Sequence, residues 1–150
     1  MKFYIATDHA GFHYKDQIKA YLAEKGIEVV DLGPETADRV DYPDYGRKCA
    51  EAVKADPGSF GIVVCGTGIG ISMAANKVPG IRAALCHDAY TATMARAHNN
   101  AQILAFGERV VGMGVVSSMI DAFIATEFEG GRHEGRVEKI DAIDEEYRCG

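Results

Sequence analysis

Residues 60–70 read FGIVVCGTGIG, a short apolar run that ends in Cys65 and leads into three alternating glycines. The run is typical of a buried parallel strand, and residues 71–76 resemble the start of a helix. The glycine loop therefore lies at the carboxyl end of a strand, where open α/β sheets bind their ligands. Because glycine has no Cβ, the loop can turn its backbone N–H groups toward a negatively charged oxygen. The stretch predicts an α/β fold with an anion or oxyanion site beside a thiol.

The loop matches neither of the common phosphate-binding fingerprints. A dinucleotide fingerprint that starts at Gly66 requires glycine at position 71, where the chain has isoleucine, and a Walker A loop requires Gly-Lys-Ser/Thr. The spacing GxGxG is equally compatible with a glycine-rich turn beside a buried, inert Cys65. The choice between these two interpretations depends on other segments.

Five apolar runs alternate with helical patterns along the 150 residues. The runs cover residues 2–7, 27–32, 60–65, 81–86 and 102–106, and the helical patterns lie near residues 11–25, 44–55, 69–77, 88–98 and 112–126. This alternation predicts a Rossmann-like three-layer sandwich, in which helices cover both faces of a five-stranded parallel sheet. No segment looks like a linker, so we expect a single domain over residues 1–150. Residues 32–43 lack a clear period and are expected to form a surface loop that borders the ligand.

A sixth helical pattern follows Gly130-Gly131 and forms a C-terminal helix. It places an apolar stripe on one face, made of Val137, Ile140, Ile143 and Tyr147. Five other helices already cover a small sheet, so this stripe can pack on the same subunit or on a partner. We expect a homodimer in which the C-terminal helix helps to build a shared site.

Composition limits the classes of function. The formal net charge of −6 and the pI near 5.3 argue against nucleic acid or an anionic membrane as partner, and a small anionic ligand would need a local cationic pocket. No apolar run is long enough to span a membrane, and the N-terminal run is too short for the core of a signal peptide. We therefore expect a soluble, cytoplasmic protein.

The four cysteines form no CxxC pair, so free thiols are expected rather than a zinc site or a disulfide framework. Cys49 falls in a helical pattern and Cys86 ends an apolar run, which makes both of them core residues. Cys149 lies in a C-terminal tail that is expected to fray. Only Cys65 has a chemically suggestive position.

Two further segments carry side chains suited to proton transfer. Asp8 and His9 follow the first strand and are expected at the same sheet edge as Cys65. Asp8 could instead cap the next helix and leave His9 merely exposed. His98, near the fifth strand, can exchange protons near neutral pH, or it can simply interact with the dipole of the helix that it ends.

Arginines are the expected source of positive charge in this acidic chain. Arg132 and Arg136 are four residues apart, so on the C-terminal helix both guanidinium groups project from one face and can clamp a phosphate. Salt bridges to Glu134 or Glu138 are the alternative. Arg109, beyond the fifth strand, is a third candidate.

Taken together, these segments resemble a known family. The stretches that carry the resemblance run in order over nearly the whole chain: residues 8–11 (DHAG), 41–43 (DYP), 65–70 (CGTGIG), 74–77 (AANK), 96–99 (RAHN) and 129–133 (EGGRH). They look like the type B ribose-5-phosphate isomerases, which belong with the LacA and LacB sugar-phosphate isomerases. The combined pattern is far more specific than any single motif.

The resemblance implies an aldose-ketose isomerase that uses no metal or organic cofactor. It also implies a homodimer with active sites at the subunit interface, and leaves open whether dimers pair into tetramers. By similarity, Cys65 would be the general base that moves a proton between C2 and C1, and Thr67 would assist at the sugar hydroxyls. His98 would open the furanose ring with Asp8 nearby. The implied substrate contacts are His9, Arg109, Arg132 and Arg136 at the phosphate, Tyr42 and Asn99 at the sugar, and the amides of Gly66, Gly68, Ile69 and Gly70 at the enediolate.

The implied reaction interconverts D-ribose 5-phosphate and D-ribulose 5-phosphate through a cis-enediol(ate). This chemistry needs a positioned base and a group that stabilises the developing oxyanion, and Cys65 with its glycine loop offers both. Some relatives use a carboxylate at another position as base, whereas this chain has Ala74-Ala75 there. The alternatives are a hexose 6-phosphate isomerase acting on allose or galactose phosphate, a noncatalytic nucleotide-binding module, and a thiol redox protein. The missing GxGxxG and the missing CxxC count against the last two.

Overall fold

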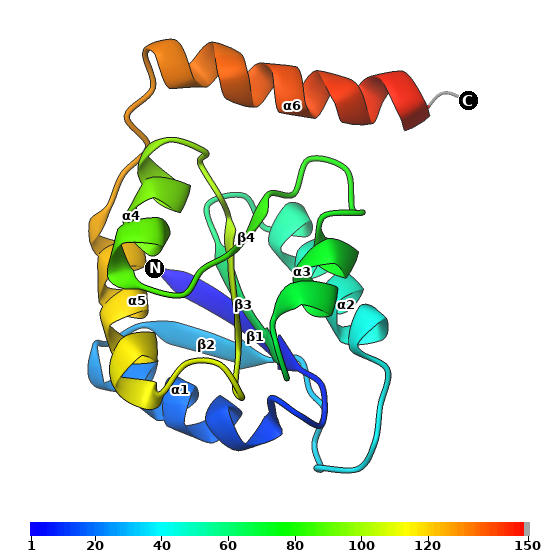
Figure 1. Ribbon diagram of the computed structural model, residues 1–150, viewed down its shortest axis with the longest axis vertical. Helices are drawn as coiled ribbons and strands as arrows, with labels where there is room; N and C mark the ends of the chain where they lie inside the picture. The colour runs from blue at the N-terminus through cyan, green and yellow to red at the C-terminus, as the bar shows by residue number, and fades with distance from the viewer. Residues whose placement is uncertain (149–150) are drawn as a thin grey trace.

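The computed structural model describes residues 1–148 and contains a five-stranded parallel sheet with helices on both faces (Figure 1). The strands are β1 (Lys2–Thr7), β2 (Glu28–Asp31), β3 (Phe60–Cys65), β4 (Ala83–Leu85) and β5 (Ile103–Gly107). They lie in the order β2-β1-β3-β5-β4, and every neighbouring pair is parallel. The predicted Rossmann-like α/β architecture is confirmed. Cys149 lies outside the described residues.

Within residues 1–148, six helices surround or overhang the sheet. They are α1 (Phe12–Glu24), α2 (Tyr42–Ala55), α3 (Ile69–Ala75), α4 (Ala89–Ala97), α5 (Met113–Ala125) and α6 (Arg132–Arg148). Buried residues of α1, α4 and α5 pack on one face of the sheet, and those of α2 and α3 pack on the other. Among residues 1–148, no helix combines the length and the apolar character needed to cross a membrane.

Alternation along β3 assigns its side chains to the two faces. Ile62 and Val64 enter the core under α1, α4 and α5, whereas Val63 and Cys65 enter the core under α2 and α3. All four are buried, which explains why the central strand reads as one continuous apolar run. The thiol of Cys65 therefore faces the layer that contains α2 and α3.

α6 stands apart from the two helical layers and lies across the top of the molecule in Figure 1. Val137, in its second turn, is buried, and an ion pair of 2.8 Å joins Arg82 to Asp141. The rest of the predicted apolar stripe is open, with exposed fractions of 45% for Ile140, 56% for Ile143 and 79% for Tyr147. The predicted C-terminal helix is confirmed, and its own subunit covers only the beginning of its stripe.

Candidate active site

The loop after β3 wraps around the thiol of Cys65. The backbone N–H of Gly68 donates a hydrogen bond to Sγ over 3.1 Å, and the side chain is 5% exposed. Gly68 has a φ of +80°, and a Cβ there would lie 2.6 Å from the backbone carbonyl carbon of Phe106. Only glycine permits this turn. A backbone amide aimed at sulfur stabilises negative charge on it, which is what a proton-accepting thiol requires.

Two side chains from distant parts of the chain lie against the same loop. The ring of Tyr42, at the start of α2, covers Gly70 so closely that an added Cβ would collide with it. Arg109, just after β5, has Nη1 3.3 Å from the position of a Cβ on Gly66, and its backbone N–H donates to the carbonyl of Gly66 over 3.0 Å. Tyr42 and Arg109, two of the residues that the family resemblance assigned to the substrate, therefore lie beside the loop that follows Cys65.

Asp8 and His9 lie at the carboxyl end of β1, next to β3, and organise loops there. Oδ1 of Asp8 accepts hydrogen bonds from the N–H groups of Ala10 and Gly11 over 2.8 and 3.0 Å, which closes the turn before α1. The N-cap of α1 is Gly11, so Asp8 does not cap that helix as the alternative expected. Nδ1 of His9 lies 3.2 Å from the carbonyl oxygen and 3.3 Å from the amide nitrogen of Val40. His9 is thus half-buried and ties down the long loop before α2, rather than being merely exposed.

Thr67 is the exposed hydroxyl of the loop. Its Oγ1 accepts a hydrogen bond from the N–H of Ile69 over 3.1 Å, so its own proton is free for donation outward. We call this collection the thiol half-site; it consists of Asp8, His9, Tyr42, Arg109 and the loop Cys65–Gly70.

His98 and Asn99 lie near the amino ends of the strands, whereas Cys65 lies at their carboxyl ends. They follow α4 and precede β5, which runs from Ile103 to Gly107, and Gly107 is the residue paired with Cys65. The strand alone separates its two ends by about 13 Å at roughly 3.3 Å per residue. A single protomer therefore does not bring His98 and the thiol of Cys65 into one pocket.

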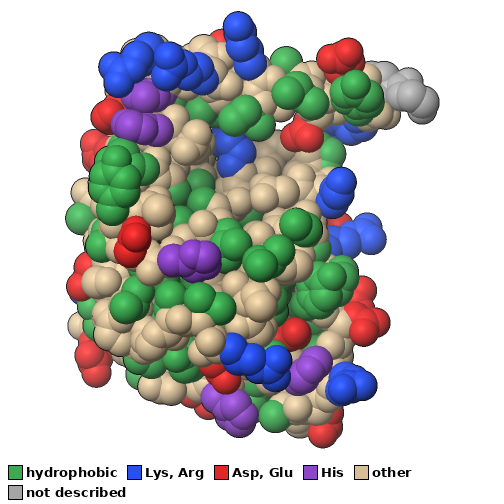
Figure 2. All heavy atoms as spheres, in the orientation of Figure 1, with side chains coloured by type: hydrophobic (Ala, Val, Ile, Leu, Met, Phe, Trp, Pro, Cys, Tyr) green, Lys and Arg blue, Asp and Glu red, His purple; other side chains and the backbone are tan. Residues whose placement is uncertain are grey.

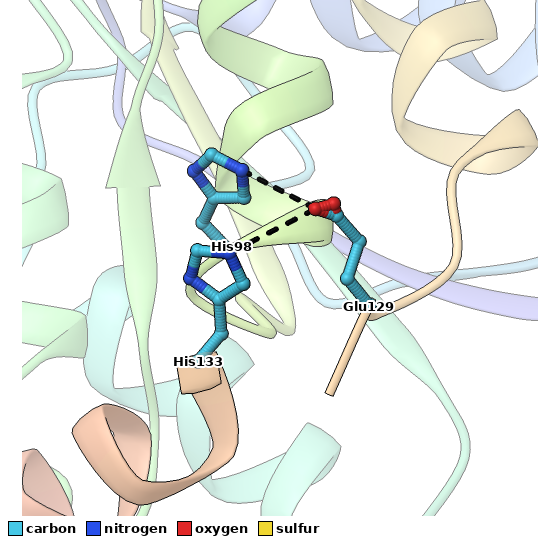
Figure 3. Close-up of side chains that lie close together, drawn as sticks. All are labelled: His98, Glu129 and His133. Atoms are coloured by element: carbon cyan, nitrogen blue, oxygen red, sulfur yellow. Dashed lines mark ion pairs between the residues drawn. The ribbon is translucent and has the colours of Figure 1, made fainter. Parts of the chain in front are cut away.

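The imidazole of His98 is stacked on that of His133, from the first turn of α6 (Figure 3). The ring centroids are 4.0 Å apart and the planes differ by 11°. Oε1 of Glu129 lies 3.4 Å from Nε2 of His98 and 3.8 Å from Nε2 of His133. The His133 side chain is 7% exposed and its Nε2 has no hydrogen-bond partner among the described residues. Burial, then the nearby charges of His98 and Arg132, lower the pKa of His133.

Sequence reasoning assigned no role to Glu129 or His133. Both stand in the stretch EGGRH and lie four residues apart. The turn at Gly130-Gly131 lies between them, so they do not belong to one continuous helix. Their histidine-carboxylate composition was the available signal. What brings them to His98 is the path of the connection between α5 and α6, which has no periodic pattern.

Arg132 and Arg136 begin α6 beside these histidines, and both are exposed. The arginines that form ion pairs within residues 1–148 are Arg47, Arg82 and Arg148, so the expected alternative of salt bridges to Glu134 or Glu138 is not seen. Figure 2 shows basic side chains and histidines gathered over this end of α6. We call this collection the histidine half-site; it consists of His98, Asn99, Glu129, Arg132, His133 and Arg136.

Comparison with known proteins gives a consistent family. The family model described as Ribose/Galactose Isomerase matches residues 3–140. Ribose-5-phosphate isomerase B of Escherichia coli K12 is 46% identical, over 96% of this chain and 97% of its own. D-erythrulose-4-phosphate isomerase of Pectobacterium atrosepticum is 45% identical, over 91% of this chain and 90% of its own. A solved structure of ribose-5-phosphate isomerase B from Clostridium thermocellum has a TM-score of 0.96 and 52% identity, covering 98% of this chain and 99% of that one.

Proposed function

The chain belongs to the ribose/galactose isomerase family, and from this premise we propose that it interconverts D-ribose 5-phosphate and D-ribulose 5-phosphate. The Cys65 thiol, held by the amide of Gly68 at the carboxyl edge of the sheet, is the observation that carries the proposal. The name of the Escherichia coli relative supports the choice of a pentose phosphate. The noncatalytic and redox alternatives find no support among relatives that are named isomerases.

In the proposed reaction Cys65 is the general base. Its sulfur removes the proton from C2 of the open-chain aldose, the C–H electron pair forms the C1–C2 double bond, and the electrons of the carbonyl move onto O1. Amides of the glycine loop stabilise that oxyanion, and the hydroxyl of Thr67 shuttles a proton between O1 and O2. Return of the proton from sulfur to C1 completes the ketose. The cis-enediolate is the intermediate between the two transfers.

The phosphate requires cations, and the two half-sites supply them from opposite sheet edges. His9 and Arg109 belong to the thiol half-site, whereas Arg132 and Arg136 belong to the histidine half-site. We propose that a homodimer joins the thiol half-site of one subunit to the histidine half-site of its partner. The open stripe on α6, Ile140 with Ile143 and Tyr147, supports this arrangement because a second copy would cover it.

Formation of ketose from ribose 5-phosphate by the purified protein tests the function, and Cys65→Ala tests the base. Loss of a general base is expected to lower kcat by about 100-fold to 10,000-fold. Cys86→Ala is the matched control, because it removes another buried sulfur, one that packs in the core on the other face of the sheet. Undiminished turnover by Cys65→Ala would eliminate the thiol as base, and thermal unfolding of each variant would separate catalytic loss from misfolding.

A different sugar phosphate is the second candidate substrate. The family description includes galactose, and a 45% identical relative is named for a tetrose phosphate. Values of kcat/KM for ribose 5-phosphate, allose 6-phosphate, galactose 6-phosphate and erythrose 4-phosphate discriminate among these substrates. A clear preference for a hexose or tetrose phosphate would replace the pentose assignment without affecting the role of Cys65.

A further inference from the structure

Glu129 occupies a fixed position relative to His98. Its backbone N–H donates a hydrogen bond over 3.0 Å to the carbonyl of Ala97, the residue that precedes His98. The backbone N–H of His98 in turn donates to the carbonyl of Met94 over 2.9 Å, which fixes the histidine to the end of α4. The backbones of Glu129 and His98 are therefore both hydrogen-bonded to the end of α4, and this holds the Glu129 carboxylate beside the His98 ring.

Two groups restrict the ring of His98. His133 covers one face of it, and because the His133 side chain is 7% exposed that ring has little freedom to move away. Glu129 faces the Nε2 edge over 3.4 Å, and the other ring nitrogen points away from the carboxylate (Figure 3). Within residues 1–148, the Glu129 carboxylate is the polar group that contacts a ring nitrogen of His98, at an ion-pair distance from Nε2. The His98 side chain is 38% exposed, so Nδ1 remains accessible.

The same three side chains are of the types that bind Zn²⁺, and their ligand atoms lie within 4.8 Å of one another. An imidazole nitrogen binds a metal through a lone pair that lies in the plane of the ring. The two ring centroids are 4.0 Å apart and the ring planes differ by 11°, so these lone pairs lie in two separate, nearly parallel planes. The two lone pairs therefore do not converge on one ion at the bond length of about 2.0–2.1 Å that zinc requires. The geometry favours an electrostatic contact between the carboxylate and Nε2 of His98 over shared metal binding.

We propose that Glu129 is a positioning residue, which holds His98 in the tautomer with its proton on Nε2 and leaves Nδ1 as the base that opens the sugar ring. This role rests on the proposed function, since it takes His98 as the ring-opening residue. An ionised carboxylate only accepts hydrogen bonds, so the nitrogen that faces it carries the proton. In neutral imidazole the second nitrogen then has a free lone pair.

Ring opening by Nδ1 leaves no net charge or proton behind. Nδ1 accepts the proton of the anomeric hydroxyl, and the O–H electron pair forms the C1 carbonyl. The C1–O4 bond breaks with its electrons passing to O4, which then receives the proton from the imidazolium. His98 returns to its starting tautomer, and Glu129 never exchanges a proton.

Imidazole ¹⁵N spectra of the full-length protein test the tautomer directly. The His98 signals are assigned by their loss in His98→Asn. We expect the Nε2–H form in the unchanged protein and a mixture of tautomers in Glu129→Gln, because a carboxamide can donate as well as accept. An Nδ1–H form in the unchanged protein, or the same pure tautomer in Glu129→Gln, would overturn the assignment.

A pair of substrates tests the consequence for catalysis. Ribose 5-phosphate forms a furanose, whereas D-erythrose 4-phosphate cannot, because its O4 is esterified. Glu129→Gln is expected to lower kcat/KM for ribose 5-phosphate by about tenfold or more and to leave the tetrose phosphate unaffected. Glu134→Gln, which removes a nearby carboxylate of α6, is the matched control.

Equal losses on both substrates would contradict a role in ring opening. Absence of isomerase activity in the unchanged protein would refute the proposed function, and the ¹⁵N spectrum would still decide the tautomer. The two failures are therefore distinguishable.

Discussion

The sulfur of Cys65 accepts a hydrogen bond from the amide of Gly68, three residues further along the glycine loop. Burial raises the pKa of Cys49 to about 12 and that of Cys86 to about 11, so both remain protonated near neutral pH. We expect iodoacetamide to modify Cys65 well before Cys49 or Cys86, and ribose 5-phosphate to slow the reaction. Peptide mass spectrometry measures the three rates, and comparable labelling of Cys49 in the folded protein would contradict the distinction.

The contact between Gly70 and Tyr42 predicts a coupled pair of substitutions. Gly70→Ala inserts a methyl group where the Tyr42 ring lies, so the ring must move off the loop. We expect KM to rise several-fold, corresponding to roughly 1 kcal/mol, in Gly70→Ala and in Tyr42→Ala. The double variant should be no worse than either single one. Gly114→Ala is the control, since nothing lies within 4 Å of its new Cβ; additive losses in the pair would show that the two residues act independently.

Mixed dimers test the joining of the two half-sites. Cys65→Ala and Arg132→Ala inactivate different half-sites, so a mixed dimer would contain one intact composite site and one doubly altered site. Random reassortment after joint refolding should restore about a quarter of the activity of the unchanged protein. Mass spectrometry of the intact dimers verifies the exchange of subunits. Mixed dimers that remain as inactive as their parents would show that each subunit works with its own arginine.

The buried imidazole of His133 predicts how stability depends on pH. Burial and the nearby positive groups lower its pKa from the ordinary value of 6.5, so between these two values the unfolded chain binds more protons than the folded one. Its contribution to stability is complete above pH 6.5 and is lost as the pH falls through the lowered pKa. We expect the drop in Tm between about pH 7.5 and about pH 5.5 to be smaller in His133→Gln. The exposed His13 provides the control variant, His13→Gln, and equal slopes in both variants would exclude His133 as the source.

Chain order alone predicts most of the sheet. Buried parallel strands read as apolar runs, and the run at residues 60–65 coincides with β3. The edge strand is less well predicted, because β4 pairs only with β5 and the hydrogen-bonded ladder is limited to Ala83–Leu85. Residue pattern cannot reveal where such a ladder stops.

The thiol half-site is also predictable, since residues that follow parallel strands meet at one edge. Chain direction likewise indicates that His98, which precedes β5, lies at the other edge. Sequence reasoning placed His98 near β5 without using this direction. The stack with His133 and the position of Glu129 depend on the irregular connection between α5 and α6, for which the sequence has no periodic signal.

The placement of Cys65 and His98 at opposite edges also has a consequence for how activity depends on protein concentration. A solitary subunit of the proposed enzyme holds a base without the histidine that prepares its substrate. Dilution below the dissociation constant of the pair would therefore reduce specific activity, and substrate that bridges the two subunits would oppose that loss. Catalytic output in a cell would then rise more than proportionally with the concentration of the enzyme.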